Sequence, residues 1–355
     1  MSHNTKLILG SFFRNLSHLS PVADSYYADH KNHKRLILEE PLLCCTLLMI
    51  SSRYHILPGL GGSSRADFIH SRLWKHCEHL IQRITLGMEK YSIAKTRTLG
   101  SIKALLLVIE WNPRALHFPP ENDGWDASLA PGIDDTYSMH DRSSDANHPW
   151  REEVFEPAKR SDRMSWTLLG LACTLGLELG VFEEGGGGPY PSQREDLKHT
   201  HRLLTLYSSQ VALRMGCTNL LDQITLQSRS PSTEIANDAD KAQQEREIML
   251  SKWIEITKLL KTTSQMFFTI TYRTGVKSNV LSKNYMNLIE HFEPLLIAWR
   301  KEFKLLQFTS KDVAMAVLHY MLTLPNQPYL KLLDKYCSSN IAMWSSLSAR
   351  LRCKP

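Results

Sequence analysis

The side chains in this sequence that could most readily bind a metal lie in one short segment, at His70, His76, Cys77 and His79. Imidazole nitrogens and thiolates are ligands that zinc prefers, but a pair on one helix needs a third ligand from elsewhere. His76 and His79 are three residues apart and share a face of the predicted helix. His70 lies on a different face, and Cys77 belongs to the apolar stripe. We therefore interpret the histidines as exposed structural side chains and predict no metal site.

Enzyme motifs are absent from the sequence. It contains no Gly-x-Ser-x-Gly, no His-Glu-x-x-His and no Gly-x-Gly-x-x-Gly. The run Gly185–Gly188 lacks the following Lys-Ser or Lys-Thr of a phosphate-binding loop, and no predicted strand precedes it, so it is interpreted as a flexible connector. An α-helical enzyme would need polar side chains facing one cleft, and no such set can be assembled from the sequence. We predict that the chain is not an enzyme and holds no cofactor.

Composition and charge are those of an ordinary globular protein, with 43% apolar and 22% charged residues. The net charge of +6 is spread along the chain and gives weak support to direct nucleic-acid contact. No apolar run reaches the roughly 20 residues that span a bilayer, and no signal peptide is visible, so we expect an unsecreted chain without a membrane partner. The cysteines are odd in number and widely spaced, which predicts buried free thiols in an intracellular compartment. They are Cys44, Cys45, Cys77, Cys173, Cys217, Cys337 and Cys353.

Apolar periodicity predicts helices along the chain. Residues 69–84 carry apolar side chains at three- and four-residue spacing with charged residues opposite, as in an amphipathic helix. Residues 102–111 are apolar nearly all round apart from Lys103 and Glu110, which predicts a central buried helix. A further apolar seam runs through residues 285–306. No stretch alternates in the manner of a strand, so the predicted fold class is all-α, a multi-helix domain with long loops and no sheet core.

Three polar stretches interrupt the helices and predict loops or linkers: residues 118–162, 183–194 and 228–241. A loop of the first length is uncommon inside a compact domain, so we interpret it as an insertion. Beyond them, shorter helices are predicted at residues 313–322 and 329–347.

Several blocks of sequence carry a family resemblance. Residues 40–54 contain Glu-Pro-Leu-Leu followed by Met-Ile-Ser-Ser-Arg-Tyr, and residues 166–180 contain Trp-Thr-Leu-Leu-Gly-Leu-Ala followed by Leu-Gly-Leu-Glu-Leu-Gly. In this order the two blocks resemble the middle homology region of fungal zinc-cluster transcription factors, a fungal-specific regulatory domain. A third block, residues 201–216, lacks the family's paired tryptophans, and Gln210 stands near where an aspartate is common.

A narrower resemblance involves residues 71–77, 94–101 and 111–120, which are similar to activators that respond to aromatic amino acids. The family resemblance implies a nuclear protein that regulates transcription by RNA polymerase II, with a small-molecule effector, co-regulators or the transcription machinery, and a homodimer as partners. Genes of amino-acid or nitrogen catabolism are the implied targets.

DNA binding is not expected from this chain itself. Family members read DNA through six cysteines in two Cys-x-x-Cys groups that hold two zinc ions, and this sequence contains no Cys-x-x-Cys. We therefore predict no zinc here and expect any DNA contact to depend on a zinc cluster outside the chain. Two readings remain open: a regulatory part separated from its DNA-binding segment, or a DNA-free helical scaffold or truncated paralogue that acts by protein–protein contact.

The extent of the family resemblance and the predicted linkers together give the domain boundaries. Residues 1–35 form an N-terminal extension, and residues 36–225 form the regulatory domain with the insertion at 118–162. Residues 226–240 form a linker, and residues 241–355 form a C-terminal helical part of the same region.

Five residues are candidates for an effector pocket: Arg53, Trp74, Arg97, Trp111 and Trp166. Arg53, Arg97 and Trp111 are polar or large residues that interrupt predicted apolar helices, where an unpaired polar group would lower stability. A guanidinium could bind a carboxylate through two hydrogen bonds, and tryptophan could stack on a ring, as an aromatic or amino-acid-like effector requires. The alternative is structural, with Arg53 forming a salt bridge to a core acid.

The helix predicted around residues 166–180 contains Gly170, Gly176 and Gly180. Each glycine costs about 1 kcal/mol relative to alanine inside a helix. Close approach of another helix would offset this cost, and the wall of an effector pocket is the alternative explanation.

Overall fold

The computed structural model describes residues 3–23, 25–55, 57, 59, 61–89, 95–117, 149–183, 191–221, 238–273 and 278–306. Regular structure in these ranges is helical throughout, without a strand, which confirms the predicted all-α class. The α-helices are α1 (His3–Asn15), α2 (His33–Glu39), α3 (Pro41–Tyr54), α4 (Gly62–Thr85), α5 (Leu99–Trp111), α7 (Pro149–Glu178), α8 (Pro191–Met215), α9 (Asp238–Arg273) and α10 (Ser278–Leu305). Four 3-10 turns join them: η1 (Ser17–Leu19), η2 (Ser25–Ala28), η3 (His30–Asn32) and η4 (Arg114–Leu116). None of the described helices has the length and apolar character to cross a bilayer.

The helix α5 is the centre of the fold. Every residue from Gly100 to Ile109 is buried, as expected for a helix that is apolar nearly all round. Its amino end is capped by Thr98, whose hydroxyl accepts a hydrogen bond from the Ser101 backbone N–H at 3.1 Å. Pro113 cannot continue the helix, which ends at Trp111. The central buried helix predicted from the sequence is confirmed.

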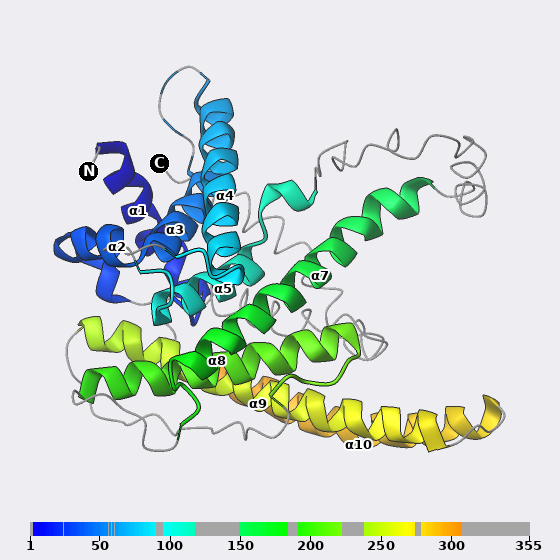
Figure 1. The fold of residues 1–355 in the computed structure, drawn as a ribbon. Helices are drawn as coiled ribbons and strands as arrows, with labels where there is room; N and C mark the ends of the chain where they lie inside the picture. The colour runs from blue at the N-terminus through cyan, green and yellow to red at the C-terminus, as the bar shows by residue number, and fades with distance from the viewer. Residues whose placement is uncertain are drawn as a thin grey trace, which may run out of the picture.

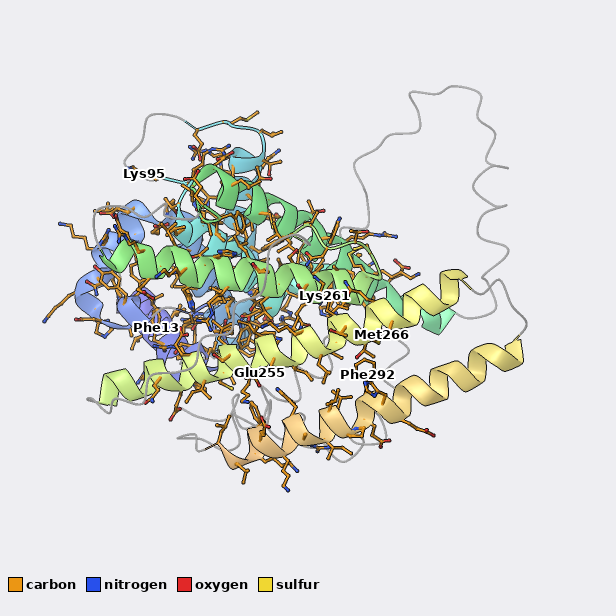
Figure 2. All side chains as sticks on the ribbon, turned by 90° about the horizontal axis from the view of Figure 1, so that it is seen from below. Phe13, Lys95, Glu255, Lys261, Met266 and Phe292 are labelled. Atoms are coloured by element: carbon orange, nitrogen blue, oxygen red, sulfur yellow. The ribbon has the colours of Figure 1, made fainter. Side chains whose placement is uncertain are left out.

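The other helices pack around α5 in succession. The helix α3 lies between α5 and α4, while α7 and α8 contact α5 and each other. Next, α9 packs on α8 and α10 packs on α9 (Figure 1). In Figure 2, α9 and α10 run side by side, and Phe292, which is buried, lies on the face of α10 that turns toward α9. Trp299 and Phe303 of the predicted apolar seam are also buried.

The described residues of the predicted N-terminal extension, 3–23 and 25–35, contribute to the core. The helix α1 packs against α3, and its Leu9 and Phe12 side chains are completely buried. The Ser51 hydroxyl of α3 donates a hydrogen bond to the Ile8 carbonyl oxygen at 2.6 Å. The sequence did not reveal this role because the segment is short and its apolar residues are interrupted by polar ones.

The predicted loop 118–162 is wrong in its second part, since α7 begins at Pro149. Proline suits the first turn of a helix, and charged residues with good helix propensity follow it. Two of them, Lys159 and Glu156, form an ion pair at 2.8 Å. The start of this helix was hidden because residues 149–162 are mostly polar and Pro157 lies inside the helix. Likewise, α8 begins at Pro191, within the loop predicted at 183–194, and α9 begins at Asp238, within the predicted linker 226–240. The helices predicted at 313–322 and 329–347 lie outside the described residues.

The cysteine prediction is confirmed for Cys44, Cys77 and Cys173, which are buried free thiols. Cys45 is half-buried, and Cys217 is exposed, contrary to expectation. Burial raises the pKa of the Cys44 and Cys173 thiols to about 12, so both stay protonated at neutral pH. Cys337 and Cys353 lie outside the described residues.

The three glycines of the α7 region have different explanations. A Cβ atom on Gly176 would lie 2.8 Å from Leu204 Cδ1 of α8, so close approach of another helix is confirmed there. A Cβ atom on Gly170 would meet nothing within 4 Å. Gly180 lies beyond the helix with φ +67°, and the Val181 N–H donates to the Gly176 carbonyl oxygen at 2.9 Å, as in a Schellman cap.

These differences predict opposite effects of two alanine substitutions in one helix. We expect Gly176→Ala to lower the free energy of unfolding by about 1–3 kcal/mol, because the new methyl group overpacks the contact with Leu204. Gly170→Ala is the matched control and should raise it by up to about 1 kcal/mol, because it gains helix propensity without a clash. Urea unfolding of both variants measures the difference. Equal effects of the two substitutions would contradict the packing explanation.

Candidate functional site

Arg53 lies in the last turn of α3 and ties it to the end of α5. Its Nη1 donates a hydrogen bond to the Asn112 carbonyl oxygen at 2.7 Å, and its guanidinium carbon lies 5.7 Å from the centre of the Tyr54 ring. The Tyr54 ring meets the Trp111 ring edge-on, with 5.6 Å between centres. The structure therefore brings Arg53 and Trp111 together. Among the described residues, the arginine binds a backbone carbonyl and forms no ion pair with a core acid.

Asn112 extends this junction to α7. Its Nδ2 donates to the Ser161 hydroxyl at 2.8 Å, while its Oδ1 is buried and accepts no hydrogen bond from the described residues. The junction of α3, α5 and α7 thus combines a guanidinium, a buried amide oxygen and two aromatic rings. These groups could bind a small polar ligand.

His70 stabilises the same junction and is buried, so its predicted exposure is wrong. Its Nδ1 lies 2.9 Å from the Met49 carbonyl oxygen, and its Nε2 lies 3.3 Å from the Arg114 backbone nitrogen. Because a carbonyl only accepts and a backbone N–H only donates, Nδ1 carries the proton and Nε2 accepts. Burial lowers the pKa of His70, so the ring is neutral.

The other metal-capable side chains do not converge on His70. His76 and His79 are exposed, whereas Cys77 is completely buried. In the described ranges, no three or more His, Cys, Asp or Glu side chains are placed to hold a metal ion.

Arg97 lies just before α5, at the end opposite Arg53. Its Nη1 contacts Glu178 Oε2 at 2.5 Å, its Nη2 donates to the Ile84 carbonyl oxygen at 3.0 Å, and its Nε lies 3.4 Å from Glu89 Oε2. These contacts tie the end of α4 to the end of α7. Since the 13 residues of α5 span about 20 Å, the two arginines face different surroundings.

Trp74 and Trp166 are half-buried and pack against the core from α4 and α7. The hydrogen bonds and ring contacts found in the described residues do not join either tryptophan to Arg53, Arg97 or Trp111. Of the five candidate residues, Arg53 and Trp111 lie in the same place, at the junction of α3 and α5.

The two charged residues of α5 form contacts that the sequence analysis did not use. Lys103 is buried, and its Nζ lies 3.7 Å from Asp196 Oδ1 of α8. Glu110 accepts a hydrogen bond from the Tyr207 hydroxyl of α8. Lys103 and Glu110 are seven residues apart and so share one face of the helix. Both residues are charged and lie within an otherwise apolar helix, and this sequence signal could have identified them as residues with partners on a neighbouring helix.

The first half of α8 also binds α9 through a half-buried ionic network. Arg202 Nη1 donates to Glu247 Oε2 at 2.6 Å, and His199 Nδ1 lies 3.4 Å from Glu247 Oε1. Hydrogen bonding to His199 and to Arg202 lowers the pKa of the Glu247 carboxyl to about 2, against the opposing effect of burial. Glu247 is therefore ionised at neutral pH. Further along α8, Gln210 Nε2 donates to the Thr257 hydroxyl of α9 at 2.5 Å.

A comparison with known proteins gives one informative relative. The chain is 42% identical over 307 residues to a protein called Transcription factor hmgR from Aspergillus fumigatus. The aligned region covers 82% of this chain and 40% of that protein, so the chain spans less than half the length of the relative. No family model matches the sequence, and no solved structure matches it. Over most of its length, the chain is thus similar to part of a fungal transcription factor.

The buried carboxyl of Glu110 predicts a pH-dependent stability. Burial raises its pKa from an ordinary value of 4.5 to about 7, although hydrogen bonds with Ser20, Tyr207 and Trp111 oppose the change. The folded protein therefore holds this proton more tightly than the unfolded chain does. The tighter proton binding stabilises the folded protein below about pH 4.5. As the pH rises from about 4.5 to about 7, this contribution is lost, and the free energy of unfolding falls by about 3 kcal/mol.

We expect Glu110→Gln to be more stable than the wild type at about pH 8, with the advantage shrinking as the pH falls toward 5. Tyr207→Phe is the opposing control: it removes a donor to the ionised carboxylate and should destabilise more at high pH than at low pH. Denaturant unfolding across this pH range measures both. A Glu110→Gln effect that does not change with pH would contradict the assignment.

Proposed function

We propose that the chain is the regulatory region of a fungal transcription factor of the zinc-cluster family and acts in the nucleus. The similarity to Transcription factor hmgR over 82% of the chain carries this proposal. The all-α architecture and the blocks at residues 40–54 and 166–180 support it, since both resemble the family's regulatory domain. In this proposal the chain binds co-regulators or the transcription machinery and controls genes of amino-acid or nitrogen catabolism.

DNA binding is assigned to a zinc cluster outside this chain. The sequence has no Cys-x-x-Cys pair, and its described cysteines are not grouped with other possible metal ligands. A zinc cluster of this type needs six cysteines in two such groups. The regulatory region would therefore control transcription through its effect on segments that lie beyond it.

We further propose that the junction of α3, α5 and α7 senses a small effector. Arg53 offers a guanidinium beside the Tyr54 and Trp111 rings, and the buried Asn112 Oδ1 is an acceptor without a donor among the described residues. A carboxylate would bind the guanidinium, and a ligand N–H would satisfy the amide oxygen. Because the junction joins three helices, an effector bound there would change how firmly α5 is held at this end.

A reporter experiment tests the proposed function. The full chain is fused to an unrelated DNA-binding domain in a fungal cell, and reporter transcription is compared with that of the DNA-binding domain alone. We expect the fused chain to change reporter output, and the change to differ between ammonium and an aromatic amino acid as nitrogen source. A fusion that leaves the reporter unchanged in both media would instead favour a scaffold acting by protein–protein contact.

Substitutions in the same fusion test the effector site. Arg53→Ala should abolish the difference between the two media while leaving the protein folded, and Arg97→Ala tests the opposite end of α5 in the same way. Arg194→Ala, which removes an exposed arginine of α8, is the matched control. A medium-dependent response that persists in the Arg53 variant would refute the junction as the effector site, and one that persists in both variants would refute any arginine-based effector site.

A further inference from the structure

The helix α4 presents a row of basic side chains to solvent. Figure 1 shows α4 at the edge of the molecule, where its first turns extend beyond the other described helices, and it packs chiefly against α3. Arg65, Arg72 and Lys75 are exposed and project from one side of the helix. Neither arginine forms an ion pair or hydrogen bond with a described residue, and Lys75 influences Glu78 through its charge alone.

Acidic side chains are missing from this row. The two acids of α4 are Asp67, which is bound by Arg114 of η4, and Glu78, which lies at the margin of the row. By contrast, the exposed Arg35 of α2 has Glu39 one turn away at 2.8 Å. The positive charge along the exposed side of α4 is therefore not compensated by the helix that carries it.

An exposed aromatic ring lies within the row. Phe68 is 65% exposed, more than any other Phe, Tyr or Trp side chain that the structure describes. It follows Arg65 by three residues and precedes Arg72 by four, so a cation lies one turn away on each side. Aromatic and arginine side chains are enriched where proteins contact each other. The row thus has the composition of a protein interface.

The spacing of the row fits a second helix that lies alongside α4. Steps of three and four residues alternate, which is the pattern that one helix presents to another, at positions 65, 68, 72, 75, 79 and 82. We call these six residues the outer face of α4. The face is about 25 Å long, since each residue of a helix adds about 1.5 Å. Its charged members are basic, so a complementary helix carries carboxylates.

Nucleic acid fits the outer face less well. Double-stranded DNA carries one negative charge for about every 1.7 Å of its axis. Arg65 and Arg72 are separated by about 10 Å along α4, so a single row of this kind would neutralise few phosphates. Carboxylates two turns apart on an acidic helix have the same spacing as the two arginines.

We propose that the outer face of α4 docks an acidic amphipathic helix of a protein partner. Its carboxylates would lie against Arg65, Arg72 and Lys75, and an apolar side chain would cover Phe68. For its role in the cell this proposal rests on the proposed function, in which the chain binds co-regulators or the transcription machinery. The docking itself does not use the Arg53 junction.

Fluorescence anisotropy with three labelled probes tests the charge requirement. The first is a synthetic helical peptide of about 20 residues, which spans the outer face, with glutamates spaced to oppose the cations and a leucine to oppose Phe68. The second has glutamine in place of each glutamate, and the third is a DNA duplex of random sequence. We expect the full chain to bind the acidic peptide at least about tenfold more tightly than the glutamine peptide, with an affinity that falls as salt is added.

Three results would overturn the proposal. They are a folded chain that binds neither peptide, one that binds both peptides equally, and one that binds the duplex more tightly than the acidic peptide.

Two variants locate the contact. Arg72→Glu should weaken binding of the acidic peptide at least about tenfold, because it replaces attraction by repulsion. Phe68→Ala should weaken it at every salt concentration, because the leucine of the peptide loses its apolar contact. Both side chains are exposed, so both variants should fold. Arg194→Glu, which changes an exposed arginine of α8, is the matched control and should bind as the wild type does. Unchanged affinity in both α4 variants would place the peptide elsewhere and refute the docking surface.

The peptide measurement and the reporter experiment have separate outcomes. A chain whose fusion changes reporter output but does not bind the acidic peptide would lose the docking surface and keep its regulatory role. A chain that binds the peptide but leaves the reporter unchanged would keep the docking surface and lose the transcriptional role.

Discussion

Burial of α5 on every side is the constraint on which the rest of this structure depends. A helix that contacts α3, α7 and α8 has little contact with water, so its polar groups depend on neighbouring elements for their partners. Thr98 caps its amino end and donates a hydrogen bond to Glu40. At the other end, Arg53 binds the Asn112 carbonyl. These hydrogen bonds fix the positions of the surrounding helices as much as apolar packing does.

The helix α8 supplies polar partners to α5, α7 and α9 and thereby connects these three helices. Asp196 and Tyr207 meet the two charged residues of α5, while Arg202 and Gln210 bind α9. Arg214 pairs with an aspartate of α7 at 2.6 Å. Polar contacts require particular partners, whereas apolar contacts tolerate repacking. The arrangement of α7, α8 and α9 about α5 is therefore specific rather than merely compact.

The sequence predicted those features that depend on periodicity. The buried helix α5 and the close packing at Gly176 were visible because apolar and small residues recur at helical spacing. The start of α7 was missed because that segment is mostly polar and has Pro157 inside the helix. The burial of His70 was missed because the Met49 carbonyl that binds it lies 21 residues away in the chain. Contacts between elements distant in sequence leave no local pattern, and they decide where Lys103 and Arg53 point.

The proposed effector site lies at one end of α5, and this position decides which helices a bound ligand would affect. The Arg53 junction lies at the carboxyl end of α5 and involves α3 and α7. The amino end of α5 is held by other elements, since Arg97 joins the ends of α4 and α7 there. A ligand at the junction would therefore strengthen the attachment of α3 and α7 to α5 without touching the contacts between α8 and α9. Ligand-dependent protection of α3 with an unchanged α9 is the physical signature of a ligand bound at the junction.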